Sequence, residues 1–393
     1  MEPEGQTQRG LRAVKILLIL ALLLVANSAY LAAFGDANLF YVANALFHPF
    51  LGITAAVLLI AFLRRNPGFL SCSAARLGAA FLALSAAFGG YLAIFGMTRP
   101  NSWALYAHVA LAIAGLAFLL LSWRSRLATG NWKAETGKSP NFQFPVSSFE
   151  PRAWRWCMGV MLGSLAFYGI VAGYQKLRPN PHFIIRNPNT APLSMEGEGG
   201  GPNSLMFPSS ATTTDGKPIT SQFFMDSESC KACHADIYNQ WNSSMHHMAS
   251  FNNQWYRKSI EYMQDTIGIK SSMWCAGCHD HAIAFAGKMQ KQHIREIVHT
   301  REAQNGLGCM SCHSIVHVKD SMGQGGFVMD YPPLDELASS KNPLLIAMHN
   351  YAVKLNPKPH RTAFLKPFHK DPSQVAEFCS SCHKVHLDVP VNN

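Results

Sequence analysis

Four short sequences in the C-terminal half of the chain bring two cysteines and a histidine together in one fixed spacing. Each reads Cys-x-x-Cys-His. The pattern is typical of covalent c-type haem attachment, in which two thiols form thioethers with the vinyl groups of one porphyrin and the adjacent imidazole binds the iron from the proximal side. The expected thioether cysteines are Cys230, Cys233, Cys275, Cys278, Cys309, Cys312, Cys379 and Cys382, and the expected proximal ligands are His234, His279, His313 and His383.

Two other chemistries use paired cysteines. Zinc sites with four thiolate ligands are built from Cys-x-x-Cys units, but zinc does not require a histidine directly after every second cysteine, and all four units have one. A thioredoxin-like redox pair would not recur four times. The sequence therefore predicts four covalently bound haem c groups. We expect these haems to supply the core of their domain, which should be unfolded without them.

A surplus of histidines surrounds the motifs. Haem iron has a second axial position, and bis-histidine ligation favours electron transfer over binding of small molecules. His182 lies just before this region and is a less favoured candidate. The other histidines from residue 223 onward are His246, His247, His281, His293, His299, His317, His349, His360, His369 and His386.

His246 lies in the stretch Trp241-Asn-Ser-Ser-Met-His246-His-Met-Ala249, shortly after the first motif. This stretch and the motif spacing resemble the cytochrome c554-like multihaem family, over the haem domain only. In that family a Trp-x-x-Ser-x-His-x-x-Ala segment carries a distal haem ligand. The resemblance therefore implies a distal role for His246, and less certainly for its neighbour His247.

Three more histidines are favoured distal candidates, and His281, His349, His369 and His386 are less favoured ones. His317 follows His313 by four residues, so it would share a helix face with it if the motif helix continues, and it would serve another haem. His299 precedes the third motif by ten residues. His360 lies in the long interval before the fourth motif, where proteins of similar sequence place a distal ligand. Spacing alone does not assign these histidines to particular irons.

The N-terminal half contains five apolar segments, each about long enough to cross a bilayer as a helix. The first is alternatively a cleaved signal peptide, with Ala26-Asn-Ser-Ala29 as the cleavage site. We expect an all-α membrane bundle of about five transmembrane helices, followed by a mainly α, loop-rich tetrahaem cytochrome c domain. The expected spans are about 16–34, 42–63, 75–97, 103–123 and 155–175.

Charge is distributed unevenly and predicts the orientation. Residues 1–178 hold 15 of the 33 Lys and Arg but 5 of the 23 Asp and Glu, whereas residues 179–393 hold 18 of each. The excess of basic over acidic residues therefore lies entirely in the apolar half, which indicates a role in membrane topology and argues against nucleic-acid binding. With the N-terminus inside, 12 of those 15 basic residues lie on the inner side, as the positive-inside rule requires. Five crossings then place the haem domain in the periplasm of a bacterial cytoplasmic membrane.

The composition suggests three regions. These are a transmembrane domain at 1–175, a flexible linker at 176–222 that is rich in Pro, Gly, Ser and Thr, and a haem domain at 223–393. The sequence leaves open that the haem domain continues beyond Asn393. Within it, helices are expected at 222–238, 253–263, 284–301 and 344–353. The two remaining cysteines, Cys72 and Cys157, are expected to be buried thiols.

Two histidines fall inside the apolar segments. His48 is near the start of the second span and His108 near the start of the fourth. Both spans run from outside to inside, so the two side chains are expected at similar depth. An intramembrane ionisable residue indicates function. The pair suggests one haem b between helices two and four, or a quinol pocket. The alternative is that each histidine hydrogen-bonds within the bundle or extends its ring to the membrane interface.

These features favour one function and leave two alternatives open. The favoured function is a membrane-anchored tetrahaem electron carrier that works between quinol, or a membrane b haem, and periplasmic protein partners. One alternative is an oxidoreductase that acts on a small nitrogen compound at a five-coordinate haem. The other is a haem-bearing structural subunit of a larger respiratory or photosynthetic complex.

Overall fold

The computed structural model describes residues 4–129 and 149–387 and divides into two compact units. The first, called here the N-terminal unit, contains the chain up to Arg178 together with Pro333–Thr362. The second, called here the motif unit, contains Pro179–Pro332 and the residues from Ala363 onward. The first unit is built on long apolar helices, and the second carries all four Cys-x-x-Cys-His motifs.

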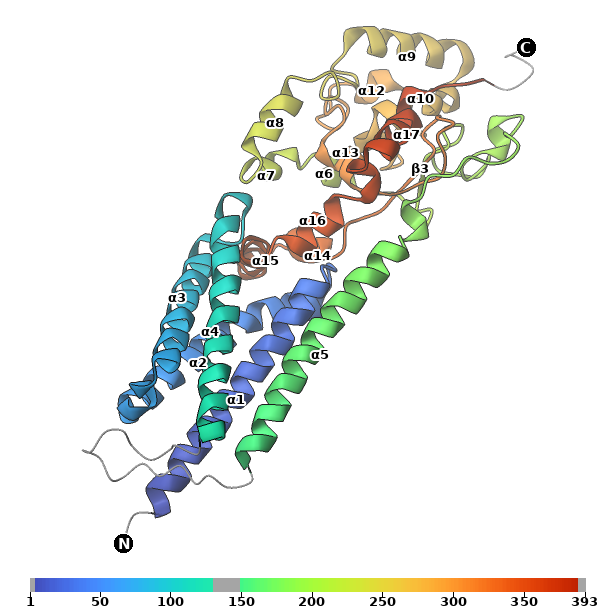
Figure 1. Cartoon of the computed structure of the whole chain (residues 1–393). Coiled ribbons are helices and arrows are strands. Elements are labelled where there is room, and N and C mark those ends of the chain that lie inside the picture. The colour runs from blue at the N-terminus through green and yellow to red at the C-terminus, as the bar shows by residue number, and fades with distance from the viewer. Residues whose placement is uncertain (1–3, 130–148, 388–393) are drawn as a thin grey trace. The chain divides into compact units, whose positions relative to one another are not determined.

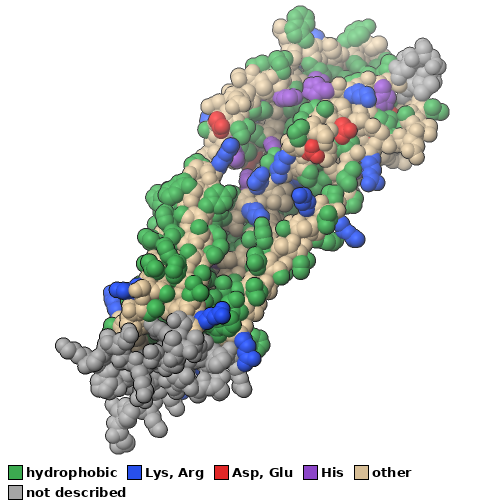
Figure 2. All heavy atoms as spheres, in the orientation of Figure 1, with side chains coloured by type: hydrophobic (Ala, Val, Ile, Leu, Met, Phe, Trp, Pro, Cys, Tyr) green, Lys and Arg blue, Asp and Glu red, His purple; other side chains and the backbone are tan. Residues whose placement is uncertain are grey.

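Five helices in the N-terminal unit are long and apolar enough to span a membrane, which confirms the predicted fold class (Figure 1). They are α1 (Glu4–Ala33), α2 (Leu39–Arg65), α3 (Ser73–Phe95), α4 (Ser102–Thr129) and α5 (Phe149–Leu177). Large apolar side chains on them remain exposed, as lipid contact requires, and Figure 2 shows such side chains over their visible face. Examples are Ile53, Val57, Leu84, Ile113 and Leu165.

Small residues let α3 and α4 approach closely. A Cβ atom on Gly78 would stand 2.8 Å from Cγ of Leu119, and one on Gly115 would stand 2.8 Å from Cγ of Leu82. The two glycines thus receive side chains of the opposite helix in a reciprocal arrangement. In lipid, where burial of apolar surface gives no net drive, this kind of close packing holds helices together.

Residues 333–362 pack against the ends of these helices within the N-terminal unit. The segment contains α14 (Asp335–Ala338), α15 (Pro343–Leu355) and the start of α16 (Lys358–Phe364). Lys354 Nζ donates to the carbonyl of Ile94 at 3.1 Å, and Lys358 Nζ donates to that of Leu31 at 3.1 Å. Both lysines therefore cap C-terminal carbonyls, of α3 and α1 respectively. This placement differs from the expectation that residues 223–393 form one haem domain.

The motif unit consists of short helices and a small sheet. Strand β3 (Phe327–Met329) lies between β1 (Thr212–Thr213), with which it is parallel, and β2 (Ile315–Val318), with which it is antiparallel. The helices are α6 (Ser221–Phe224), α7 (Ser227–Lys231), α8 (Ala235–Asn242), α9 (Gln254–Ile267), α10 (Met273–His279), α11 (His281–Ala284), α12 (Ile294–Ile297), α13 (Cys309–His313) and α17 (Pro372–His383).

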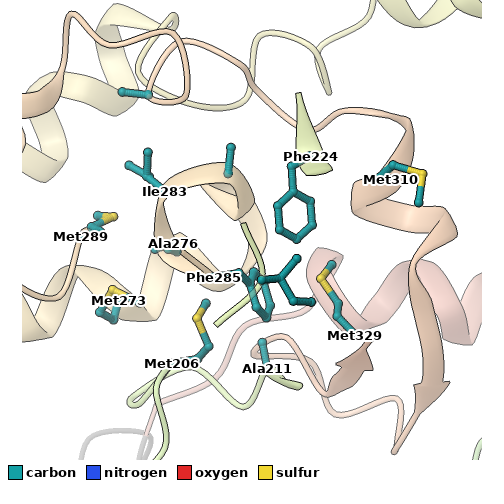
Figure 3. Close-up of a cluster of buried hydrophobic side chains, with 14 of the residues drawn as sticks. Met206, Ala211, Phe224, Met273, Ala276, Ile283, Phe285, Met289, Met310 and Met329 are labelled. Atoms are coloured by element: carbon teal, nitrogen blue, oxygen red, sulfur yellow. The ribbon is translucent and has the colours of Figure 1, made fainter. Parts of the chain in front are cut away.

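A protein core exists in this unit, contrary to the expectation that haem alone would supply it. Phe224, Phe285, Met206 and Met273 are fully buried in one cluster (Figure 3). These residues come from separate short segments, none of which has enough apolar positions to show a period. The core could therefore not be predicted from a periodic pattern of apolar residues.

Two local expectations also differ from the structure. The presumed linker is packed: Met206 and Ala211 are fully buried, and the amide of Ser210 donates to the carbonyl of Gln324 at 2.8 Å. Its prolines and glycines make turns that are fixed by bonds to distant loops. In the expected helix at 284–301, α12 alone is α-helical, since Gly287 adopts a φ of +71° that breaks the helix.

Candidate haem sites

Each attachment motif lies on or next to a helical turn. The second motif ends α10, the third forms α13 and the fourth ends α17, while the first leaves α7 through a turn before α8. In the first motif, the amide of His234 donates to the carbonyl of Cys230 at 2.9 Å, which completes one helical turn. Residues three and four apart lie on one helix face. Local folding therefore places both sulfurs and the imidazole of a motif on one side.

The motifs form two pairs by side-chain contact. The thiols of Cys230 and Cys309 lie close enough for each to shift the pKa of the other, upward for Cys230 and downward for Cys309, which brings the first motif beside the third. The thiols of Cys278 and Cys382 interact in the same way, which brings the second motif beside the fourth. These sulfurs would form the thioethers that hold haem, so each contact would bring the attachment edges of two porphyrins near each other.

Two proximal histidines have the tautomer that iron binding needs. His279 Nδ1 donates to the carbonyl of Ala249 at 2.7 Å, and His313 Nδ1 donates to the carbonyl of Phe364 at 2.6 Å. A carbonyl can only accept, so the proton is on Nδ1 and the lone pair of Nε2 is left for a metal. Burial lowers the pKa of both imidazoles, which favours the neutral form. These side chains fit the haem that the motifs imply.

His246 lies close to the histidine of the fourth motif. Its ring centroid is 6.0 Å from that of His383, with an interplanar angle of 75°. Two bonds hold its loop beside the third motif: the amide of Leu307 donates to the carbonyl of His246 at 2.8 Å, and Trp241 Nε1 donates to the carbonyl of Leu307 at 2.7 Å. The ring of the neighbouring His247 instead packs against that of Trp241 at an interplanar angle of 32°, and its Nδ1 bonds to the carbonyl of Asn242. The pairing proposed for His246 is therefore with the fourth haem.

His317 does not extend the third motif's helix. That helix ends at His313, and His317 lies on β2. Its ring centroid is 5.8 Å from that of His182, and its Nδ1 donates to the carbonyl of His182 at 2.6 Å. No sequence pattern links these two residues, because His182 lies in a segment that was expected to be a flexible linker.

The two other distal candidates lie elsewhere. His299 is exposed in the turn after α12. His360 is half-buried on α16 and belongs to the N-terminal unit, whereas the motif histidines belong to the motif unit. The distal roles of both remain predictions.

His369 was ranked low from sequence, yet its ring centroid lies 5.3 Å from that of His313. It precedes Cys379 by ten residues, the same interval that separates His299 from Cys309, and this repeated spacing was the available signal. Its Nδ1 accepts from the amide of Lys366 at 3.1 Å, which puts the proton on Nε2. Burial lowers the pKa of His369 to about 4. The side chain thus offers a neutral hydrogen-bond donor beside the third motif.

Tyr256 is a neighbour of the second motif that the sequence did not reveal. Its ring stacks on that of His279, with centroids 4.4 Å apart and an interplanar angle of 14°. Its hydroxyl donates to the carboxylate of Asp280, which also accepts from Ser250. Burial raises the pKa of Asp280 to about 7 and that of Tyr256 well above its usual value. The network fixes one side of the His279 ring.

The attachment motifs and the five apolar helices together define a membrane-anchored c-type cytochrome. The family model described as cytochrome c554 and c-prime matches residues 229–314, which include the first three motifs. This part of the chain is a cytochrome c554-like haem domain, as its sequence resemblance indicated, and the family implies covalently bound haem c. The fourth motif and the membrane helices lie outside the match. Neither curated proteins nor solved structures give a significant match.

Proposed function

We propose that this protein carries electrons through four haem c groups at the outer face of a bacterial cytoplasmic membrane, between quinol or a membrane haem and periplasmic protein partners. The observation that supports this proposal is the pairing of the motifs, first with third through Cys230 and Cys309 and second with fourth through Cys278 and Cys382. Porphyrin edges held this close to one another suit electron transfer. When bound, the haems supply the redox chemistry, and the protein tunes it through ligands and exposure.

The residues of the chain have three tasks in this proposal. The motif cysteines fix each porphyrin, and carbonyls such as those of Ala249 and Phe364 orient the proximal imidazoles. The half-buried ring of Tyr256 covers one side of the His279 ring and would help to exclude water from the second site. Low solvent exposure and hydrogen bonding to the ligands are the levers that set haem potentials.

The orientation is part of the proposal and rests on the distribution of basic residues. Arg64 and Arg65 end α2, and Arg76 lies in the first turn of α3, on the side assigned to the cytoplasm. A fusion of alkaline phosphatase to the C-terminus should be active, and a fusion within residues 130–148 should be inactive. The reverse pattern would overturn the topology.

Haem stoichiometry and quinol reduction test the function. The full chain, purified in detergent and placed in lipid nanodiscs, should contain four covalent haems in a pyridine haemochrome assay. A short-chain quinol should reduce them without oxygen. Fewer than four covalent haems would overturn the tetrahaem assignment. A full complement that quinol does not reduce would exclude quinol as the donor and favour a structural role.

The second candidate function is catalysis at a five-coordinate haem, which one observation favours. Within the described ranges 4–129 and 149–387, the ring of His279 is in ring contact with Tyr256 and with no histidine, whereas His383 and His313 each have a histidine nearby. A high-spin ferric signal in electron paramagnetic resonance, altered by hydroxylamine or nitrite, would support this function. Four low-spin haems would exclude it.

A further inference from the structure

Two histidines of the N-terminal unit meet inside its helix bundle. His48 lies on α2 and His108 on α4, and their ring centroids are 6.2 Å apart with an interplanar angle of 81°. Both lie within membrane-length apolar helices. Ionisable side chains at such positions are costly and are kept for function.

The tautomer of His108 is fixed by a backbone carbonyl. Its Nδ1 lies 2.8 Å from the carbonyl oxygen of Ser85 on α3, which can only accept. The hydroxyl of Ser85 in turn donates to the carbonyl of His108 at 2.9 Å. The proton of the imidazole is therefore on Nδ1, and Nε2 carries a lone pair.

A chain of three hydrogen bonds through the side chains of Asn44 and Asn27 fixes His48 in the same tautomer. Asn44 Nδ2 donates to the carbonyl of Phe40 at 2.8 Å, so its Oδ1 is free to accept from Asn27 Nδ2 at 3.0 Å. This orients Asn27 Oδ1 toward His48 Nδ1, at 3.0 Å. Since that oxygen can only accept, Nδ1 of His48 carries the proton and Nε2 carries a lone pair.

The two imidazoles therefore cannot hydrogen-bond to each other through Nε2, because neither has a proton there. A metal between them would satisfy both lone pairs. Imidazole–metal bonds are about 2 Å long, and with about 1 Å more from nitrogen to ring centroid, two ligands on opposite sides of one metal have centroids about 6 Å apart. The observed 6.2 Å meets this requirement.

Two nitrogens are too few for a bare ion. Zinc and similar ions take four or more protein or water ligands, and no group of three or more His, Cys, Asp or Glu gathers within the described parts of the chain. A porphyrin supplies the missing four nitrogens. Along the chain, the first attachment motif begins at Cys230 and belongs to the other unit, so a porphyrin at this site would not be covalently bound.

We propose that His48 and His108 bind one non-covalent haem b through their Nε2 atoms, with Asn27 and Ser85 as positioning residues. The existence of this site does not depend on the proposed electron-transfer function. Only the electron route that the site would serve rests on that function. Its occupancy can be measured independently of the four covalent haems.

A glycine pair provides a matched test. A Cβ atom on Gly89 would lie 3.0 Å from Cε1 and 3.2 Å from Nδ1 of His108, whereas one on Gly90 would meet nothing within 4 Å. Gly89→Ala should therefore displace the His108 ring, and Gly90→Ala should not. Both substitutions add one methyl group to the same helix.

The experiment counts both kinds of haem in one sample. Acidified acetone extracts haem b from the purified full chain and leaves haem c attached. We expect one extractable haem per wild-type chain, near-complete loss in His48→Ala and His108→Ala, at least a several-fold loss in Gly89→Ala, and full retention in Gly90→Ala. The covalent haem content, expected to be unchanged throughout, shows that each variant has folded.

The contrary results are distinct. Wild-type chain with its covalent haems but no extractable haem would overturn the site and leave the proposed function standing. Retention of haem b in both histidine variants would place it elsewhere. If the variants fail to fold, the wild-type spectrum decides: near-perpendicular imidazoles give a strongly anisotropic low-spin ferric signal that should disappear with extraction. Persistence of every low-spin signal after extraction would overturn the site.

Discussion

His246 and His383 lie with their imidazole centroids 6.0 Å apart, although one follows the first attachment motif and the other ends the fourth. The separation is about that of two imidazoles on opposite sides of one iron, given metal–nitrogen bonds of about 2 Å. The loop of His246 is bonded to Leu307, next to the third motif. One short loop therefore joins sites that are far apart in the sequence.

Replacing His246 should change the spin state of one haem. If His246 is the distal ligand of the fourth haem, as we propose, His246→Ala should convert one low-spin ferric haem to high-spin, because that iron would lose an axial ligand. Electron paramagnetic resonance of the oxidised full chain measures this. His247→Ala is the matched control, since His247 bonds to the carbonyl of Asn242 and should leave the spectrum unchanged. The opposite pattern would transfer the ligand role to His247.

Replacing Asn27 should shift the potential of the proposed membrane haem. Asn27→Leu removes the acceptor of His48 Nδ1 and makes the ligand less electron-donating, so the midpoint potential should rise by roughly tens of millivolts. Potentiometric titration of the extractable haem measures the shift. Thr54→Val is the control. It removes a hydroxyl on α2, the helix of His48, that donates to the carbonyl of Phe50, and it should leave the midpoint potential unchanged. If Asn27→Leu and Thr54→Val have equal midpoint potentials, Asn27 does not position His48.

Removing a lysine cap should loosen the 333–362 segment. Lys358 Nζ donates to the carbonyls of Leu31 and Ala32 at the end of α1, at 3.1 and 2.6 Å. Lys358→Met should lower the free energy of unfolding by about 1 kcal/mol. Limited proteolysis of the segment in nanodiscs reports this as faster cleavage. Lys341→Met, at an exposed position of the same segment, should cleave at the wild-type rate. Equal rates for both variants would contradict a capping role.

Acid should remove one stabilising interaction on α9. Glu261 accepts from Arg257 Nε at 2.8 Å and from Lys258 Nζ at 2.6 Å. Hydrogen bonds from Lys258 and Arg257 lower the pKa of Glu261 to about 2. Because this lies below the unfolded value of about 4.3, the stabilisation is present above about pH 4 and is lost as the pH falls toward 2.

Glu261→Gln should remove that pH dependence. We expect a loss of roughly 1 kcal/mol at pH 7, a modest value because Lys258 is exposed to solvent. The variant should lose less stability than the wild type on acidification, in urea unfolding followed by tryptophan fluorescence. Glu296→Gln, at an exposed position on α12, is the control and should keep the wild-type pH dependence. If both variants behave alike, the ion pairs contribute nothing measurable.

Features carried by contiguous residues were predictable. The five helices follow from uninterrupted apolar runs, because a segment in lipid must satisfy its own backbone bonds. The attachment motifs are local by chemistry, since both thiols and the imidazole serve one porphyrin. His48 and His108 were expected at one depth because their spans run in the same direction, and the structure brings their rings together. That they hold a haem remains a prediction.

Features that depend on long-range packing were not predictable. Met206 is buried by residues from distant segments, so its neighbourhood in a Pro- and Gly-rich stretch indicated only a linker. The sequence of the segment that contains Lys354 and Lys358 does not distinguish it from the regions of the motifs on either side. Hydrogen bonds to helix ends produce no periodic pattern of apolar residues. The approach of His369 to His313 follows from the same long-range folding.

The route of the chain between the units has a consequence for release of the haem domain. The chain passes into the motif unit after Arg178, returns to the N-terminal unit at Pro333 and leaves it again after Thr362. The third motif thus precedes a segment that belongs to the N-terminal unit, and the fourth motif follows that segment. A protease that cuts once between the last membrane helix and the first motif would not shed a soluble cytochrome, because the remaining chain is still held by residues 333–362.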